Sequence, residues 1–350
     1  MSRTLRSPVA NAVAAVAVAA LGVSALAACQ TLPSAGSGGP DPTNVSIMVG
    51  GLDKVIYLPA ELTDRLGHFK EQGLTVDLQS QPSGANAETA LVAGQVDAVV
   101  GFYDHTIDLQ TKGKCITSVV QFANVPGEVE IVAKNSGIAS AADLPGKKLG
   151  VTSPGSSTDF LTQYLTSKVG ATPDKYTTVT AGAGATFIAA LENGGIDAGM
   201  TTDPTAQQIK EKGSGDVLLD MRTVEGTRAA LGGLYPASSL YMDCAYVQAH
   251  PGTVQKLANA FVKTMKFINT HTAAEIADKM PPDYYVGNKD QYVKALDAGK
   301  QMFTPDGVMP QGGPETVLAV LSQFKDSVKG KTIDLSKTFT TEFVDVANKK

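Results

Sequence analysis

Two segments of the chain share one pattern of apolar and polar positions. Residues 90–98 are ALVAGQVDA and residues 190–198 are ALENGGIDA, with Ala, Leu, Gly, a β-branched residue, Asp and Ala in register. In each copy an apolar helical period runs into a glycine, which is typical of a helix C-terminus, and a short apolar run then begins a strand. The repeat predicts two related βαβ units, and therefore two α/β lobes with a cleft between them.

The rest of the chain alternates short β-rich runs with helical periods. Strands are predicted at 45–49, 76–78, 98–101, 116–122, 130–133, 149–152, 179–180 and 197–200, and helices at 52–66, 85–93, 158–169, 186–192, 252–269, 289–301 and 314–327. Strands that alternate with helices predict parallel sheets. Crossings between the lobes are predicted near 124–127 and 231–236, which gives lobe 1 residues 44–128 and 232–350 and gives lobe 2 residues 129–231.

The N-terminus has the pattern of a secretory signal peptide. Arg3 and Arg6 precede an Ala/Val-rich run at 9–23, and small residues then lead to Cys29. A transmembrane helix is the weaker interpretation, because the apolar run is short and a Ser/Gly/Pro-rich spacer follows at once. The sequence LAAC ending at Cys29 resembles a bacterial lipobox, which implies removal of residues 1–28, a lipid on Cys29 and a place in the bacterial cell envelope. Residues 29–43 are expected to form a flexible tether.

Charge and cysteine content narrow the partners and the compartment. The 350-residue chain has a net charge of −5, and loss of residues 1–28 with their two arginines takes it to about −7, so a nucleic acid is not expected as a partner. Two cysteines remain, Cys115 and Cys244, each within or beside an apolar run. An exported compartment permits a disulfide, and the sequence leaves a disulfide and two buried thiols equally open.

Loops after predicted strands carry the candidate binding chemistry. In an open α/β sheet, ligands meet the loops at the carboxyl ends of the strands. The loop after strand 149–152 offers hydroxyls, a glycine and a helix N-terminus, which suits a sulfonate, phosphate, nitrate or carboxylate, and the loop at 81–84 has the same chemistry. Helix capping alone is the competing interpretation. The ligand-binding candidates from these two loops are Ser83, Gly84, Ser153, Gly155, Ser156, Ser157 and Thr158.

Other strand ends add aromatic and acidic side chains. The aromatic residues could stack on a ring, and the acids could accept hydrogen bonds from an amine. These further candidates are Gly51, Asp53, Tyr57, Phe102, Tyr103, Asp104 and Asp203. Asp97 and Asp197 are left out, because an Asp between a glycine cap and a strand usually bonds nearby backbone.

Several of these motifs resemble those of one protein family. The stretches 59–62 (PAEL), 67–76 (GHFKEQGLTV), 90–98, 142–151 (ADLPGKKLGV), 154–156 (PGS) and 194–198, followed by Asp203-Pro204, resemble ABC-transporter solute-binding proteins of the sulfonate, taurine, nitrate and thiamine-pyrimidine family. The resemblance spans roughly residues 45–211. It implies a type II periplasmic-binding-protein fold, in which two α/β lobes joined by a two-strand hinge close on a small-molecule ligand.

The resemblance also implies a mode of action. Proteins of this family deliver their solute to a membrane permease that is driven by a separate ATPase. The chain contains no Trp, so aromatic contacts must come from Phe or Tyr. We expect a monomer without a cofactor or a metal, because the four histidines lack metal-ligand spacing. An enzyme is a less favoured alternative, since neither a nucleophile elbow nor a Walker loop occurs. An envelope sensor is a further alternative.

The charge of the predicted cleft loops orders the ligand classes. These loops contain no arginine, so a monoanion or a zwitterion fits better than a multivalent anion. We rank a sulfonate or taurine-like anion first. A heteroaromatic compound, such as a pyrimidine precursor of thiamine or a flavin, is the alternative and would stack on Tyr57, Phe102 and Tyr103. Nitrate is also kept.

Overall fold

The structure is a computed structural model that describes residues 41–285 and 288–349. The contacts divide the chain into Met1–Ser37 and Gly38–Lys350, and the description below concerns the second unit. The predicted signal peptide, Cys29 and most of the tether lie outside the described residues. Within the described ranges, no helix combines the length and apolar character needed to span a bilayer.

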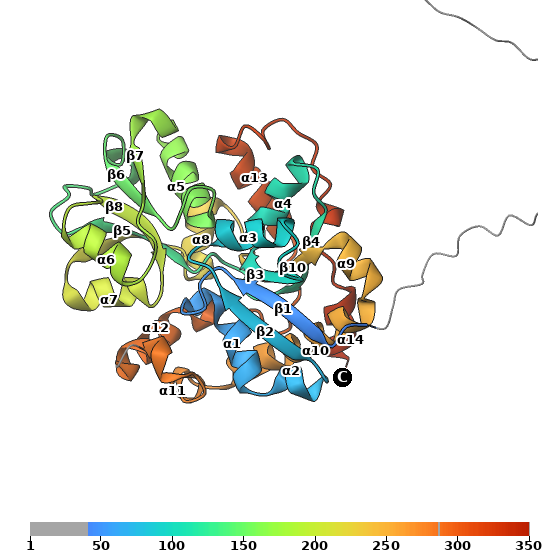
Figure 1. The fold of residues 1–350 in the computed structure, drawn as a ribbon. Helices are drawn as coiled ribbons and strands as arrows, with labels where there is room; N and C mark the ends of the chain where they lie inside the picture. Colours follow the sequence, from blue (N-terminus) through green and yellow to red (C-terminus); the bar gives the residue numbers. More distant parts are fainter. Residues whose placement is uncertain (1–40, 286–287, 350) are drawn as a thin grey trace, which may run out of the picture. The chain divides into compact units, whose positions relative to one another are not determined.

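Two five-stranded sheets form the framework of the described chain (Figure 1). The first has the order β2-β1-β3-β10-β4, with β1 at Asn44–Val49, β2 at Thr75–Ser80, β3 at Ala98–Phe102, β4 at Ile116–Gln121 and β10 at Ser238–Asp243. The second has the order β7-β6-β8-β5-β9, with β5 at Glu128–Ala133, β6 at Lys148–Val151, β7 at Thr177–Thr180, β8 at Ala198–Thr202 and β9 at Gly215–Asp220. The equivalent orders confirm two α/β lobes. The predicted boundaries of the lobes stay a prediction.

The predicted parallel pairing holds for only part of each sheet. β2, β1 and β3 are parallel, as are β7, β6 and β8, because helices connect them along the chain. β10 and β5 pair antiparallel with both of their neighbours. Each of these two strands enters its sheet from the other lobe rather than from a helical crossover, so the right-handed βαβ rule does not govern its direction. The sequence analysis also missed β9, an edge strand whose Val217 is 41% exposed.

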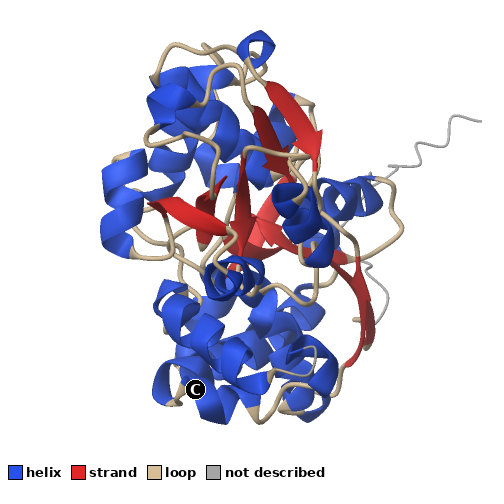
Figure 2. Ribbon diagram, turned by 90° about the vertical axis from the view of Figure 1, so that its left-hand side faces the viewer, coloured by secondary structure: helices blue, strands red, loops and turns tan. Residues whose placement is uncertain are grey.

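Helices cover the strands of both sheets (Figure 2). Those between strands are α1 (Leu58–Arg65), α2 (His68–Glu71), α3 (Gly84–Val92), α4 (Asp104–Thr111), α5 (Ser157–Lys168), α6 (Ala185–Glu192), α7 (Thr205–Lys212) and α8 (Val224–Leu231). The C-terminal part adds α9 (Cys244–Ala249), α10 (Pro251–Thr270), α11 (Ala273–Ala277), α12 (Lys289–Gly299), α13 (Gly313–Phe324) and α14 (Glu342–Asn348). The repeated segments end α3 and α6, followed by Gly94 and Gly194 with φ of 69° and 68°.

The two acids of the repeat hold strands together. Asp97 accepts a hydrogen bond from the backbone N–H of Ser46 and Asp197 accepts one from that of Lys148, each at 2.8 Å. Both bonds join the start of the repeat strand to the neighbouring parallel strand. These contacts agree with the structural role predicted for the two acids.

Two segments carry the chain between the sheets and are hydrogen-bonded to each other. Gly127 N–H donates to the carbonyl of Met221 at 3.1 Å, and Met221 N–H donates to that of Glu128 at 2.9 Å. Gly127 has a φ of 67°, and a Cβ there would lie 2.7 Å from a side-chain carbon of Ile56. Both the backbone conformation and the crowding therefore require glycine at this crossing.

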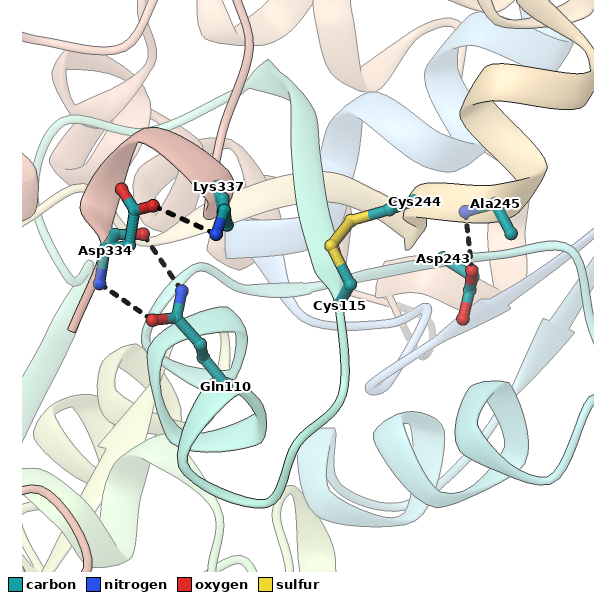
Figure 3. Close-up of a disulfide and its surroundings, with 7 residues drawn as sticks. All are labelled: Gln110, Cys115, Asp243, Cys244, Ala245, Asp334 and Lys337. Carbon is teal, nitrogen blue, oxygen red and sulfur yellow. Dashed lines mark hydrogen bonds and ion pairs between the residues drawn. A yellow bond between two sulfur atoms is a disulfide. The ribbon is translucent and has the colours of Figure 1, made fainter. Parts of the chain in front are cut away.

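A disulfide joins Cys115 to Cys244 (Figure 3). Cys115 directly precedes β4 and Cys244 directly follows β10, and these strands are antiparallel neighbours. The bond therefore links adjacent strand ends in the first sheet, which decides between the two alternatives that the sequence left open.

Candidate ligand-binding site

One small cavity lies where strand ends of the two sheets meet. Its volume is about 20 Å³, enough for about one water molecule. The part of the chain with the first sheet lines it with Lys54, Ile56, Tyr57, Gly84 and Phe102. The part with the second sheet, to which Glu128 belongs as the first residue of β5, lines it with Glu128, Thr152, Ser156, Ser157, Thr158, Ala183, Thr201 and Thr202. The lobes also touch beside the cavity, where the N–H of Val55 donates to the carbonyl of Asp203 at 2.9 Å. The cavity therefore lies between lobes that are in contact.

Two helix N-termini, one from each lobe, reach this cavity. Gly84 begins α3, and Ser157 and Thr158 begin α5. A Cβ placed on Gly155 would lie 4.0 Å from the Cβ of Ala85, so the loop before α5 is in van der Waals range of α3. Each helix N-terminus carries a partial positive charge and unpaired backbone N–H groups. The arrangement directs two such termini toward one small space.

Hydroxyl groups around the start of α5 hold this loop in place. Ser156 is the N-cap, and its Oγ accepts from the N–H of Asp159 at 3.4 Å. Thr152 Oγ1 donates to Ser156 Oγ at 2.9 Å, and the N–H of Thr152 donates to Thr158 Oγ1 at 3.0 Å. Ser83 caps α3 in the same way, with its Oγ accepting from Asn86 N–H at 3.2 Å. Capping of the helix and lining of the cavity therefore occur together in the α5 loop, although the sequence analysis treated them as competing interpretations.

Lys54 supplies a cation to the cavity wall. Its side chain is buried, and Nζ donates to the carbonyls of Gly50 at 2.6 Å and Pro82 at 3.2 Å. Burial lowers the pKa of Lys54 from 10.5 to about 8. The sequence analysis named its neighbour Asp53 instead, but Asp53 is exposed and does not line the cavity. The position of Lys54, a few residues after the predicted strand 45–49 and at the start of the predicted helix 52–66, was the signal that could have identified it.

A carboxyl group faces the cavity from the second lobe. Glu128 begins β5, is 2% exposed, and its Oε2 has no hydrogen-bond partner among the described residues. Burial, the first cause, and the nearby carboxylate of Asp104 raise the pKa of Glu128 well above its usual value. Glu130 is two residues further along the strand, and burial raises its pKa to about 8. The sequence analysis missed Glu128, because it began the predicted strand at residue 130 and left Glu128 in the connection before it.

Asp104 lies behind the cavity and links the lobes. Its Oδ1 accepts from Ser157 Oγ and its Oδ2 accepts from Tyr235 Oη, each at 2.9 Å. Asp104 is fully buried, and burial raises the pKa of its carboxyl. In this structure both oxygens of the Asp104 carboxyl therefore already accept hydrogen bonds from protein groups.

The structure brings six predicted residues together in the cavity and places the others around it. Tyr57, Gly84, Phe102, Ser156, Ser157 and Thr158 line it, with the rings of Tyr57 and Phe102 in an edge contact at 6.3 Å. Gly51, Asp53, Ser83, Tyr103, Asp104, Ser153, Gly155 and Asp203 do not line it.

Two of these outlying residues have other contacts. Tyr103 is buried, and its hydroxyl bonds the side chain of Thr338. Asp203 pairs with Arg222 at 3.0 Å and accepts from the N–H of Gln207 in α7 at 3.1 Å.

No group of three or more His, Cys, Asp or Glu side chains in the described part of the chain could hold a metal ion.

A comparison with known families matches residues 59–274, well over half of the chain, to the family described as NMT1/THI5 like. The chain belongs to the NMT1/THI5-like family. The matched range contains the motifs at 67–76, 90–98 and 142–151. Membership of this family agrees with the family group that the sequence motifs suggested.

Individual relatives place the chain more closely. It is 27% identical over 234 residues to a 4-amino-5-hydroxymethyl-2-methylpyrimidine phosphate synthase of Aspergillus parasiticus, an alignment that covers 64% of this chain and 67% of that protein. A solved structure from Bordetella bronchiseptica RB50 is 35% identical, covers 88% of this chain and 98% of its own, and superposes with a TM-score of 0.84.

A more distant structural neighbour shows the fold. The alkanesulfonate-binding protein SsuA of Xanthomonas axonopodis pv. citri, solved with bound MOPS, is 18% identical, covers 86% of this chain and 99% of its own, and has a TM-score of 0.66. This chain therefore has a periplasmic-binding-protein fold.

Proposed function

We propose that this protein is the extracytoplasmic solute-binding component of an ABC importer, and that it captures a small sulfonate or taurine-like anion between its two lobes. One observation carries the proposal: the N-termini of α3 and α5, which belong to different lobes, line the same cavity. A ligand bound to both termini favours the state in which the lobes touch, and this bias is the basis of capture by closure.

The charges around the cavity support an anionic group on the ligand. Lys54 adds a cation beside the two helix N-termini, and the hydroxyls of Ser157 and Thr158 lie at the start of α5. Backbone N–H groups at helix N-termini bind sulfonate-like oxygens without arginine. The alkanesulfonate-binding neighbour of the same fold adds weight to this choice.

A heteroaromatic ligand is the second candidate, and the aromatic side chains favour it. Tyr57 and Phe102 form an edge-to-face pair in the cavity wall, which could stack on a pyrimidine ring. A curated relative is named as a pyrimidine phosphate synthase. That name also keeps an enzymatic role as an alternative. The signal-peptide pattern argues for a binding protein instead.

Ligand-dependent thermal stability tests this function. The full-length protein in mild detergent would be melted with alkanesulfonates, taurine, nitrate, pyrimidines and flavins, because a ligand of the folded state raises the melting temperature. A shift with sulfonates that is lost in the Ser156→Ala/Ser157→Ala variant supports the proposal. A shift with ring compounds alone would replace it with the heteroaromatic candidate.

The envelope attachment is a separate part of the proposal. We expect Cys29 to carry a lipid that anchors the protein at the outer face of a bacterial membrane, near a permease with a separate ATPase. Metabolic labelling with a fatty acid tests the anchor: the wild-type chain should incorporate the label and Cys29→Ser should not. Incorporation by the variant would contradict this assignment.

A further inference from the structure

We infer that Glu128 is a specificity-determining residue that accepts a hydrogen bond from an N–H group of the ligand, so that the site selects compounds with such a group over isosteres without one. The inference rests on the proposed function and narrows its ligand class. It assigns the ligand two ends: an anionic or ring portion toward the helix N-termini, and an N–H donor toward β5.

The first step is the state of the Glu128 side chain. Glu128 is 2% exposed and lines the cavity. Its Oε2 has no hydrogen-bond partner among the described residues. A buried polar atom without a partner is costly, and such atoms are rare in folded proteins. The cavity between the touching lobes has room for about one water molecule, so a ligand donor would satisfy this atom once the lobes part enough to admit the ligand.

The second step is that Lys54 does not already serve this purpose. Its Nζ is bound to the carbonyls of Gly50 and Pro82, on the first-lobe side of the cavity. No ion pair between Lys54 and Glu128 occurs within 4.0 Å in the described structure. The cation is therefore committed to backbone and the carboxyl is not.

The third step is the position of Glu128 on its strand. It stands opposite Thr202 in the antiparallel β5–β8 pair, and Thr201 Oγ1, also in the cavity wall, has no partner among the described residues. Glu128 and Thr201 thus each bring a polar atom without a partner to the cavity wall, although Thr201 stands opposite Val129 rather than Glu128. The helix N-termini supply donors and these groups supply acceptors, so the cavity is complementary to a ligand with both kinds of group.

Matched ligand pairs test the inference by calorimetry on the full-length protein in detergent. Taurine is compared with propane-1-sulfonate, and 4-amino-2-methylpyrimidine with 2-methylpyrimidine. We expect wild-type protein to bind the N–H member of one pair about 10- to 100-fold more tightly, the range for a hydrogen bond to a charged or buried group. Glu128→Met, which has a similar size and no acceptor oxygen, should abolish most of that preference.

Glu130→Met is the matched control, because Glu130 is buried two residues further along the same strand and does not line the cavity. It should keep the wild-type preference. Equal binding of both members by the wild type, or a preference that survives in a folded Glu128→Met, overturns the inference. If Glu128→Met does not fold, the smaller Glu128→Ala, which also lacks an acceptor, takes its place.

The two pairs separate this inference from the proposed function. A Glu128-dependent preference for taurine supports both. A Glu128-dependent preference in the pyrimidine pair alone supports the role of Glu128 and overturns the sulfonate assignment. Equal, tight binding of taurine and propane-1-sulfonate supports the sulfonate assignment and overturns the role of Glu128. Binding of no member of either pair overturns both.

Discussion

Ser157 at the start of α5 donates a hydrogen bond from Oγ to the buried Oδ1 of Asp104 at 2.9 Å, and this bond joins the two lobes directly behind the cavity. Tyr235 supplies the second hydroxyl donor to the same carboxyl. Asp104 is 0% exposed, so no solvent replaces a lost donor in this arrangement of the lobes. A single side chain therefore connects the N-terminus of α5 with the first lobe.

This bond predicts the effect of removing the Ser157 hydroxyl. Ser157→Ala should lower the free energy of unfolding by about 1–3 kcal/mol, because it leaves a buried acceptor unsatisfied. It should also weaken ligand binding, since the contact forms only when the lobes meet. Urea denaturation and calorimetry measure the two effects. Ser167→Ala, near the C-terminus of the same helix, is the control and should change neither quantity appreciably.

The pKa of Lys54, lowered to about 8 by burial, predicts how anion binding depends on pH. Below pH 8 the ammonium is charged and the affinity for propane-1-sulfonate should be nearly constant. Above it the free protein loses this charge, and the affinity should fall by up to about tenfold per pH unit. Lys54→Met should bind the anion more weakly and lack this dependence. Calorimetry across the alkaline range tests this; an equal pH dependence in the variant would contradict the role of Lys54.

Glu130 predicts a dependence of stability on pH. Its folded-state pKa of about 8 lies above the ordinary value of 4.5, so the folded state binds more protons than the unfolded state between these two values. Its contribution to stability is therefore full below pH 4.5 and falls as the pH rises to about 8, by a few kcal/mol in total.

Glu130→Gln isolates this contribution. The amide stays neutral, so the variant should show a smaller loss of unfolding free energy between about pH 4.5 and pH 8 than the wild type. Urea denaturation at several pH values measures the difference. Identical pH profiles for the two proteins would show that Glu130 is not the titrating group.

The disulfide predicts a loss of stability without a loss of binding. Removal of the Cys115–Cys244 bond, which spans 129 residues, should lower the free energy of unfolding by about 2–5 kcal/mol. Cys115 lies at the amino end of β4. This end of the sheet is opposite the carboxyl ends of β1 and β3, which border the cavity. Ligand affinity should therefore remain.

Urea unfolding with and without dithiothreitol tests the bond. The Cys115→Ser/Cys244→Ser variant is the control and should not respond to the reductant. A wild-type protein equally stable in both conditions would argue against the disulfide.

The sequence by itself determined the two-lobed α/β plan and several residues of the cavity. The repeat at 90–98 and 190–198 was readable because helix periodicity, a glycine cap and a buried strand are local patterns, set by backbone sterics and burial of one face. The loop at 156–158 was readable for the same reason, since parallel strands bring their carboxyl ends to one edge.

Only the tertiary structure decided what those residues meet. Phe102 and Thr202 end their strands and line the cavity, but the next residue in each case does not. Tyr103 bonds the side chain of Thr338 instead. Asp203 pairs with Arg222, which is 19 residues away along the chain. Lys54 and Glu128 line the same cavity from the parts of the chain that hold different sheets. They meet there because the chain crosses to the second sheet directly before β5, which then runs antiparallel to β8. Side-chain direction at such positions depends on packing between distant segments, and no local period of the sequence encodes it.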